Sequence, residues 1–245
     1  MPDRRDTSDM TTRAAIQNAG LRISRPEIGV WVQQLSTAAF TGRPCFFLDR
    51  DGVVVEEVNY LHRVEDVVLI GDVAQAIAEI NRTGNPVVMV TNQAGIGRGY
   101  YGWDAFAAVQ ERLLGALAQH NARIDMVLAC AYHRDAIGPY AICDHPWRKP
   151  RAGMLLEAAR ILRVDLGRSF IIGDTVSDLL AGMEAGLVCG ALALTGHGRR
   201  EYRMHSAELD AWRDQGRFHA QVVDNAAVAI RDRLKKGNGP RCVAW

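Results

Sequence analysis

Residues 45–48 most constrain the fold of this chain, because a short apolar run stops there at two closely spaced carboxylates. The run is brief and aromatic, which is typical of a strand covered on both faces. Asp49 and Asp51 follow it with Arg50 between them, and Gly52 allows the backbone to turn sharply. Side chains alternate along an extended chain, so we expect the two aspartates on one side and Arg50 on the other.

Two carboxylates this close repel each other unless a cation or a shared proton lies between them. Asp49 and Asp51 therefore indicate a metal site or acid–base chemistry. The same residues are also typical of a strand that ends in an Asx-type turn. This stretch alone leaves the two interpretations open.

The composition of the 245-residue chain indicates a globular protein, since 48% of its residues are hydrophobic. Its net charge of +1 provides no bulk field for nucleic acid or a membrane surface. No apolar run approaches the ~18 residues needed to cross a bilayer, and the N-terminus lacks the apolar segment of a secretory signal. Five scattered cysteines fit a reducing compartment better than a disulfide framework. We therefore expect a cytoplasmic protein without nucleic-acid or membrane partners.

From residue 45 onward, short apolar runs alternate with segments of helical periodicity, which is typical of βαβ units and a parallel sheet. The predicted strands span residues 45–48, 86–90, 124–131, 169–172, 187–194 and 218–223. The predicted helices span residues 72–81, 103–120, 154–162, 177–185 and 225–234. A glycine-rich loop is predicted at residues 95–99. The sequence thus predicts an α/β fold with a mostly parallel sheet.

The pattern predicts one folded domain with an additional segment at each end. Residues 41–235 carry the alternating elements and form the predicted domain. Residues 1–40 are predicted as a partly flexible N-terminal extension, although residues 28–40 carry enough apolar surface to pack on the core. Residues 236–245 are predicted as a C-terminal tail.

Polar and charged residues stand in four places where predicted strands or the loops after them end. They are Asp49 and Asp51, Thr91 and Asn92, Arg148 and Lys149, and Asp174 and Asp178. Each pair has an ordinary structural explanation, as a helix cap, a solvated loop or a turn. Ligands of open parallel sheets lie at the carboxyl ends of the strands, so the four pairs in this order indicate one site.

These residue types predict phosphoryl transfer. Asp49 would attack phosphorus and form an aspartyl-phosphate, which water then hydrolyses. Asp51 would give a proton to the leaving oxygen and later take one from the attacking water. Thr91 and Lys149 would hold the non-bridging phosphate oxygens, through a hydroxyl donor and an ammonium charge respectively.

Mg²⁺ is the cofactor that carboxylate ligands predict at such a site. Asp49 and Asp174 would bind it with their side chains, assisted by a backbone carbonyl at Asp51. Asp178 lies one helical turn after Asp174, where it could support the site by holding an ammonium group or a metal-bound water.

Four stretches resemble the motifs of the haloacid dehalogenase superfamily. They are residues 47–52, 90–93, 148–150 and 173–178. They are most similar to its small-capped branch, which holds D-glycero-D-manno-heptose-1,7-bisphosphate 7-phosphatase and the histidinol-phosphate phosphatase domain. The resemblance covers about residues 45–235. Supporting stretches at residues 95–101, 152–154 and 194–196 are similar to the heptose enzyme in particular.

The resemblance implies a Rossmann-like three-layer sandwich without a large cap domain, and Mg²⁺-dependent hydrolysis of a small sugar phosphate. It implies substrate contacts from Arg148, and further ones from Asn92, Gln93 and Arg98. The preferred substrate hypothesis is D-glycero-D-manno-heptose 1,7-bisphosphate, with removal of the 7-phosphate. Histidinol-phosphate or another small phosphomonoester is the alternative. We expect a monomer.

The superfamily branch carries a zinc loop of Cys-x-His, a spacer and Cys-x-Cys before Arg-Lys-Pro, and this chain departs from it. Tyr132 stands in place of the expected histidine, and His145 in place of the second cysteine. Four side chains could still form a tetrahedral Zn²⁺ site. They are Cys130, His133, Cys143 and His145. We favour a metal-free loop held by the packing of Tyr132 and Trp147.

Three further departures concern the surroundings of the predicted site. Val53 and Val55 replace polar residues, and Thr175 replaces a lysine or arginine after the metal-binding aspartate. Such peripheral contacts decide specificity, so these departures put the identity of the substrate in doubt. A non-catalytic binding module on the same fold is the least favoured hypothesis, because Asp49 and Asp51 are both present.

Overall fold

A computed structural model describes residues 22–23 and 29–236 of the chain. Within these residues, eight strands form one sheet in the order β1-β2-β5-β4-β3-β6-β7-β8. Strands β3 to β8 pair in parallel, whereas β1 and β2 pair antiparallel at one edge. The mostly parallel sheet confirms the predicted α/β class.

The strands are β1 (Arg22–Ile23), β2 (Val30–Gln34), β3 (Phe46–Leu48), β4 (Val87–Asn92), β5 (Met126–Cys130), β6 (Phe170–Gly173), β7 (Cys189–Ala193) and β8 (His219–Val223). The α-helices are α2 (Val73–Arg82), α3 (Ala94–Gly97), α4 (Trp103–Ala118), α5 (Gly153–Leu162), α6 (Val176–Glu184), α7 (Gly198–Asp214) and α8 (Ala226–Lys235). Three 3-10 helices join them: η1 (Val64–Asp66), η2 (Gly138–Tyr140) and η3 (Leu166–Arg168).

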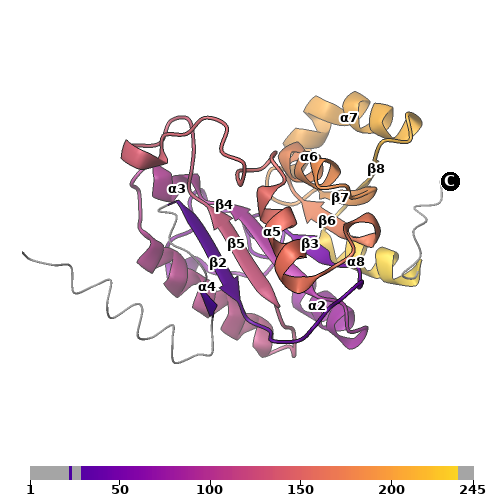
Figure 1. Ribbon diagram of the computed structural model, residues 1–245, viewed down its shortest axis with the longest axis horizontal. Helices are drawn as coiled ribbons and strands as arrows, with labels where there is room; N and C mark the ends of the chain where they lie inside the picture. Colours follow the sequence, from indigo (N-terminus) through magenta and orange to yellow (C-terminus); the bar gives the residue numbers. More distant parts are fainter. Residues whose placement is uncertain (1–21, 24–28, 237–245) are drawn as a thin grey trace, which may run out of the picture.

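Alternate residues of the central strands pack on opposite faces of the sheet, which divides the core in two. In β3, Phe46 and Leu48 belong to one buried cluster and Phe47 to the other. Helices α2, α4 and α8 cover the first face, and α5, α6 and α7 cover the second. In Figure 1, α5 lies in front of the strands, and α4 lies behind β2. The fold is therefore the three-layer sandwich that the resemblance implied.

The order of the strands places β3 at the switch point of the sheet. From β3 the chain continues through β4 to β5 on one side, and then returns to β6 on the other side of β3. Both β4 and β6 pair directly with β3. Ligands bind outside the carboxyl ends of strands at such a reversal. The residues that follow β3, β4 and β6 therefore meet at one edge of the sheet.

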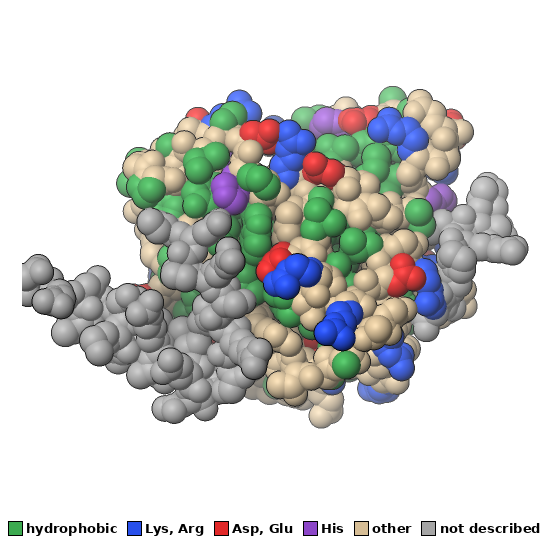
Figure 2. Space-filling view, in the orientation of Figure 1, with side chains coloured by type: hydrophobic (Ala, Val, Ile, Leu, Met, Phe, Trp, Pro, Cys, Tyr) green, Lys and Arg blue, Asp and Glu red, His purple; other side chains and the backbone are tan. Residues whose placement is uncertain are grey.

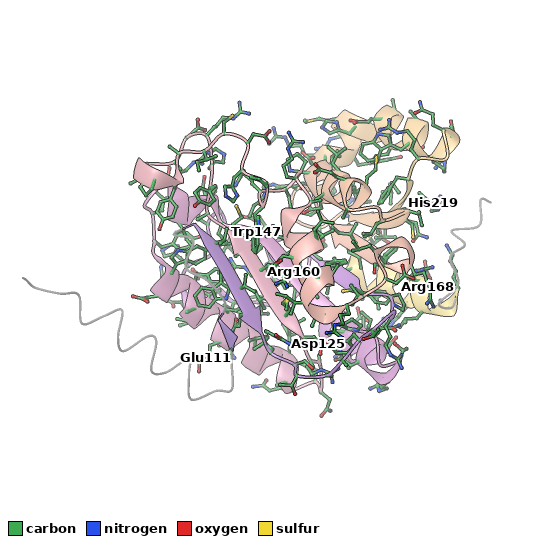
Figure 3. The ribbon with its side chains drawn as sticks, viewed as in Figure 1. Glu111, Asp125, Trp147, Arg160, Arg168 and His219 are labelled. Atoms are coloured by element: carbon green, nitrogen blue, oxygen red, sulfur yellow. The ribbon has the colours of Figure 1, made fainter. Side chains whose placement is uncertain are left out.

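Asp125 ties the strands together at the opposite edge of the sheet, where β5 begins (Figure 3). Its buried carboxylate accepts a hydrogen bond from the Val87 N–H at 2.9 Å, and its backbone carbonyl accepts one from the Leu35 N–H at 2.9 Å. These bonds join the starts of β4 and β5 to the end of β2. A buried carboxylate at this edge therefore serves the strand register rather than the site.

Strand β2 lies within the predicted N-terminal extension, residues 1–40, yet it is part of the sheet. It pairs antiparallel with β5 along five residues. Val30 and Val32 are buried, and Trp31 stacks on Trp103 of α4 with ring centroids 5.7 Å apart. Without β2, the outer edge of β5 would leave its backbone N–H and C=O groups unpaired. The sheet thus begins before residue 41, where the predicted domain starts. Residues 1–21 of the predicted extension and residues 237–245 of the predicted tail lie outside the described part of the chain.

Helix α7 is the one long described element that the sequence did not predict. Of its residues, only Gly198, Leu209 and Trp212 are buried, and most of its 17 residues are polar or charged, so few apolar positions mark it as a helix. The predicted glycine-rich loop also differs, since residues 94–97 form the short helix α3. In both cases tertiary contacts decide the conformation, because the local apolar pattern is too sparse to do so.

Charged side chains of both signs lie intermixed on the face shown in Figure 2, among hydrophobic ones. Arg160 on α5, labelled in Figure 3, is an example, since its Nε lies 2.8 Å from Glu157 Oε2. Exposed pairs of this kind contribute little to stability.

Among the described residues, no helix has both the length and the apolar character that a membrane span requires.

Replacing Val32 by Ala should lower the free energy of unfolding by about 2 kcal/mol, since it removes two buried methyl groups and leaves a cavity against β5. Val222 lies in β8 and is 38% exposed, so Val222→Ala should change it by only about 0.5 kcal/mol. Urea denaturation of the full chain measures both. Equal losses would contradict an integral role for β2.

Candidate active site

A cleft of about 320 Å³ opens at the carboxyl ends of β3, β4 and β6. The predicted site residues that line it are Asp49, Asp51, Thr91, Asn92, Gln93, Arg148, Lys149 and Asp174. Further lining residues are Glu57, Asn59, Tyr60, Leu61, Ala94, Tyr101, Thr175, Ser177 and His197. The fold thus brings together residues that are separated by more than a hundred positions in the chain.

The Lys149 ammonium lies at the centre of this arrangement. Its Nζ is 2.9 Å from Asp49 Oδ1 and 2.5 Å from Asp178 Oδ1, and it donates to the Val90 carbonyl at 2.9 Å. The side chain is only 2% exposed. Burial by itself lowers the pKa of Lys149, but the attraction of Asp178 and Asp49 outweighs it and raises the pKa. Lys149 therefore holds its positive charge between two carboxylates.

Asp49 follows β3 directly, and its backbone N–H donates to the Ile172 carbonyl of β6 at 2.9 Å. Its Oδ1 accepts the Arg50 N–H at 2.7 Å in addition to the Lys149 ammonium. Among the described residues, no donor bonds to Asp49 Oδ2. That oxygen is the one left for a metal ion or for attack on a substrate.

The pKa of the Asp49 carboxyl is raised to about 7. Burial is the largest cause, and the negative charges of Asp178 and Asp51 add to it, whereas Lys149 acts in the opposite direction. Asp49 is thus a buried acid in a field of like charges. Such a field favours the binding of an additional cation.

Asp174 follows β6 and faces the turn after β3. Its Oδ2 accepts the His197 N–H at 2.8 Å. A Cβ at Gly52 would lie 2.2 Å from this oxygen, so only glycine fits here, and Gly52 also has a φ of +76°. Burial, followed by the charges of Asp49 and Asp178, raises the pKa of Asp174 to about 9.

Asp178 is held at the N-terminus of α6 by a capping box with Thr175. Its Oδ2 accepts the Thr175 N–H at 3.1 Å and the Thr175 hydroxyl at 2.7 Å, which leaves Oδ1 for Lys149. Thr175, which stands where a lysine or arginine was expected, therefore orients the Asp178 carboxylate that pairs with Lys149.

Asp49, Asp174 and Asp178 form a group that could hold a metal ion, because one oxygen of each lies within 4.8 Å of the others. Ionised, they carry three negative charges against the single positive charge of Lys149. A divalent cation would balance the remainder, and carboxylate oxygens are the ligands that Mg²⁺ prefers. The residues therefore fit Mg²⁺. The Asp51 carboxylate is not in this group, and the sequence assigned Asp51 a backbone carbonyl only.

Arg50 does not point away from the aspartates as predicted. Strand β3 ends at Leu48, and the Val54 and Val55 N–H groups both donate to the Arg50 carbonyl in a tight turn, so strand alternation no longer applies. The fully buried Arg50 guanidinium instead turns back onto Asp51. Its Nε lies 3.2 Å from both Asp51 carboxylate oxygens, and its Nη2 lies 3.1 Å from Oδ2.

Strand β4 ends with Thr91 and Asn92, and Gln93 follows it; all three residues line the cleft. Asn92 binds the backbone of Lys149 twice, donating to its carbonyl at 3.0 Å and accepting its N–H at 3.1 Å. Thr91 Oγ1 accepts from Gln93 Nε2 at 2.8 Å and lies 3.5 Å from Asp51 Oδ2. Asn92 thus positions Lys149, in addition to lining the cleft.

Arg148 and Arg98 differ in their relation to the cleft. Arg148 lines it together with a neighbouring hollow of about 290 Å³, and its Nη1 donates to the Tyr132 carbonyl at 2.9 Å. Arg98 is not among the lining residues, and its guanidinium binds the Tyr60 hydroxyl and Asp135. Tyr60 does line the cleft, so Arg98 contacts a residue of the cleft wall without lining the cleft itself.

Of the four predicted zinc ligands, Cys130 is the last residue of β5, and the other three lie on the loop that follows it. These three are His133, Cys143 and His145. The His145 ring stacks on Tyr132 with centroids 3.9 Å apart, and its Nδ1 accepts the Trp147 N–H at 3.2 Å. In residues 22–23 and 29–236, no three of the four bring their ligand atoms together. This arrangement does not fit a tetrahedral zinc site.

Sequence reasoning assigned no site role to Arg50, Tyr60, Tyr101, Glu57 or His197. Burial, followed by the charge of Asp51, raises the pKa of Glu57. Tyr101 belongs to the stretch at residues 95–101, so that motif carried a signal for it. Glu57 and Tyr60 lie in a polar segment without periodicity, where no pattern marks them.

Comparisons with known proteins agree with this geometry. A HAD-hydrolase-like family model matches residues 146–224. A D-glycero-beta-D-manno-heptose-1,7-bisphosphate 7-phosphatase from Mesorhizobium japonicum is 50% identical over 167 residues, which cover 68% of this chain and 77% of the relative. The Haemophilus influenzae protein of the same name is 38% identical over 151 residues, covering 61% and 81%.

Two solved structures are also similar to this one. The crystal structure of a HAD-like phosphatase from Mesorhizobium loti has a TM-score of 0.68 and 48% identity, and the match covers 70% of this chain and 83% of that one. The D,D-heptose 1,7-bisphosphate phosphatase from B. bronchiseptica, complexed with magnesium and phosphate, has a TM-score of 0.65 and 28% identity, covering 79% and 99%.

The burial of Asp174 predicts a pH-dependent stability in metal-free buffer. Its pKa is raised from 3.8 to about 9, so the native state binds this proton more tightly than the unfolded state. That stabilisation is complete below the unfolded pKa and is lost as pH rises through about 9. Between about pH 6 and pH 9, the free energy of unfolding should fall by roughly 1–3 kcal/mol more in the wild type than in Asp174→Asn.

Urea denaturation with EDTA at both pH values measures this difference. The neutral amide of Asp174→Asn keeps the shape of the side chain and removes its titration, so the variant is the matched control. Equal pH dependence in the two proteins would contradict the raised pKa.

Proposed function

Since this chain belongs to the haloacid dehalogenase-like phosphatases, in the branch of the heptose 1,7-bisphosphate 7-phosphatases, and is a phosphoric monoester hydrolase, we propose that it removes the 7-phosphate of a D-glycero-D-manno-heptose 1,7-bisphosphate through an aspartyl-phosphate. One observation carries the mechanism. Lys149, Asp49 and Asp174 line one cleft at the switch point of the sheet, and the buried Asp178 carboxylate pairs with Lys149 directly behind it.

In the first step, Asp49 attacks the phosphorus of the substrate. Its Oδ2, which the backbone and Lys149 leave open, forms a bond to phosphorus as the bond from phosphorus to the sugar oxygen breaks. Asp51, in its protonated form, gives its proton to the departing sugar oxygen. The products of this step are the dephosphorylated sugar and an aspartyl-phosphate on Asp49.

In the second step, Asp51 acts as the base. Its carboxylate takes a proton from a water molecule as that water attacks the aspartyl-phosphate. The bond from phosphorus to Asp49 breaks, which releases inorganic phosphate and restores the Asp49 carboxylate. Asp51 is protonated again and ready for the next substrate. One residue therefore serves as acid and base in turn.

Asp49 and Asp174 are the side chains that would hold Mg²⁺, assisted by the backbone carbonyl at Asp51, while Asp178 would support the site through its ion pair with Lys149. When bound, Mg²⁺ supplies positive charge beside the phosphoryl oxygens. Lys149 would add its own charge, and Thr91 a hydroxyl donor, on the same oxygens. The related structure from B. bronchiseptica contains magnesium and phosphate, which supports this part of the proposal.

Two features of the chain support a bisphosphate as the substrate. Relatives that are 50% and 38% identical to this chain carry the name heptose-1,7-bisphosphate 7-phosphatase. In addition, Arg148 lies between the cleft and the neighbouring hollow, which Arg134 also lines; the Asp144 carboxylate in that hollow is paired with Arg151. A second phosphate on the substrate would meet positive charge there. Asn92 and Gln93 would bound the sugar between the two phosphates.

Replacing Asp49 by Asn tests the mechanism. Turnover should fall by more than about 10³-fold, because an amide cannot form the phosphoryl ester. Mass spectrometry of acid-quenched wild type should show a phosphorylated peptide that contains Asp49, and this peptide should be absent from Asp49→Asn. A folded Asp49→Asn protein with unchanged phosphate release would exclude the mechanism.

Replacing Arg148 by Ala tests the substrate. Loss of a charged hydrogen-bond donor should lower kcat/KM for heptose 1,7-bisphosphate by about 10- to 100-fold, mainly through KM. For the heptose 7-phosphate, which lacks the second phosphate, the loss should be several times smaller. Phosphate release is measured with both anomers of the bisphosphate, the 7-phosphate and histidinol-phosphate. Preference of the wild type for histidinol-phosphate would favour the alternative substrate instead.

A further inference from the structure

Arg50 is a charged side chain in the interior of the protein, and its guanidinium is fully buried. It lies over the ring of Phe106 in α4, 5.1 Å from the ring centroid. Removing an arginine from water costs several kcal/mol, and an apolar residue would fill the same space at lower cost. The presence of the charge therefore suggests a use that packing alone does not require.

The counter-charge of Arg50 is the carboxylate of Asp51. The guanidinium Nε lies 3.2 Å from each carboxylate oxygen, and Nη2 lies 3.1 Å from Oδ2. Two donors on one rigid plane fix the direction of the carboxylate as well as its distance. Asp51 is 19% exposed and lines the cleft, so its other side faces the substrate space.

Gln93 completes this hold on Asp51. Its Nε2 donates to Asp51 Oδ2 at 3.1 Å and to Thr91 Oγ1 at 2.8 Å. Its Oε1 accepts from Arg50 Nη2 at 3.3 Å and from the Tyr101 hydroxyl at 2.7 Å. All four hydrogen bonds of the amide are used, so its orientation is determined. The buried wall of the cleft thus contains one connected network around Asp51.

The backbone leaves Asp51 in need of such support. It lies beyond the end of β3, in a turn where the next residue, Gly52, has a φ of +76°. A carboxylate in a turn can occupy several rotamers, whereas proton transfer requires one direction toward the reacting oxygen. The side-chain network supplies the order that a strand would otherwise provide.

We propose that Arg50, together with Gln93, is a positioning residue for the acid–base chemistry of Asp51, holding its carboxyl in the one orientation from which a proton reaches the leaving oxygen of the substrate. This inference rests on the proposed function, because it takes Asp51 as the proton donor. Arg50 itself touches no substrate and acts through Asp51.

Dependence on the leaving group separates this role from a merely structural one. A sugar oxygen leaves as a strongly basic alkoxide and needs a proton, so misplacing the donor slows its departure. The p-nitrophenolate ion leaves without a proton, so its departure tolerates a misplaced donor. A general loss of structure slows both kinds of ester equally.

The experiment measures the single-turnover rate of the first step, with Mg²⁺, for a series of phosphate monoesters whose leaving groups range from sugar alkoxides to p-nitrophenolate, because the second step also uses Asp51 and is the same for every ester. In Arg50→Met, which keeps the length of the side chain, this rate should fall by about 10²-fold for the sugar phosphate. For p-nitrophenyl phosphate, it should change less than about threefold. Arg50→Lys keeps the charge and loses the planar fork, so its loss on the sugar phosphate should lie between wild type and Arg50→Met.

Gln93→Leu covers the case in which an Arg50 variant fails to fold, because it keeps the ion pair between Arg50 and Asp51. It should show the same selectivity for leaving groups with a smaller loss on the sugar phosphate. Tyr101→Phe removes a single hydrogen bond to Gln93 and should show the smallest loss. Equal loss on alkyl and aryl esters, or no loss on either, in the variants that fold would overturn the proposal.

Arg233 provides the matched control. It is also buried, lies 5.9 Å from the ring centroid of Phe170, and donates to the Arg168 carbonyl at 3.1 Å. Phe170 begins β6, whereas the cleft lies where β6 ends, and Arg168 is labelled in Figure 3 on the side of α8. Arg233→Met should lower the free energy of unfolding and leave the ratio of alkyl to aryl turnover unchanged.

Asp51→Asn distinguishes failure of this inference from failure of the proposed function. Loss of the proton donor itself should depend on the leaving group at least as strongly as Arg50→Met does. If Asp51→Asn shows that dependence and the Arg50 and Gln93 variants do not, the positioning role is wrong and the mechanism stands. If Asp51→Asn does not show it, the role of Asp51 in the mechanism is wrong.

Discussion

The ion pairs of Lys149 with Asp49 and Asp178 are the interactions on which the site depends. One buried ammonium group stands 2.9 Å from the first carboxylate and 2.5 Å from the second. Three carboxylates could not lie this close in the interior without a positive charge, because each would then gain a proton or move toward water. Lys149 holds them at a distance that still leaves a net negative charge. The site is thus partly neutralised by the protein itself, and the remaining charge suits a divalent cation.

Much of the remaining structure keeps Lys149 in place. Asn92, at the end of β4, binds the backbone of Lys149 on both its N–H and its carbonyl. The Thr175 cap turns Asp178 toward the ammonium group. A different set of contacts orders the other half of the site, where Arg50 holds Asp51. Two cations thus divide the acidic residues between them, since Lys149 pairs with Asp49 and Asp178, and Arg50 pairs with Asp51.

The loop that carries Arg148 packs through aromatic side chains. His145 stacks on Tyr132, and the Tyr132 carbonyl accepts from Arg148. A Cβ at Gly29 would lie 2.5 Å from the Tyr132 ring, so the residue before β2 packs closely against this stack. The N-terminal strand, which closes the edge of β5, therefore also supports the loop that carries Arg148. Aromatic contacts thus contribute to the packing of this loop.

The sequence by itself determined the parallel α/β architecture and the identity of the polar groups at the strand ends. Short apolar runs that alternate with helical segments are typical of buried parallel strands, and polar residues that directly follow such strands lie at the carboxyl edge of the sheet. It did not determine β2 or α7, whose apolar patterns are short or sparse, and it assigned Arg50 to the wrong side. Only the tertiary structure decided which charges pair, because Lys149 meets Asp49 across the fold, and the turn after β3 brings the Arg50 guanidinium back onto Asp51, where strand alternation would place it on the other side.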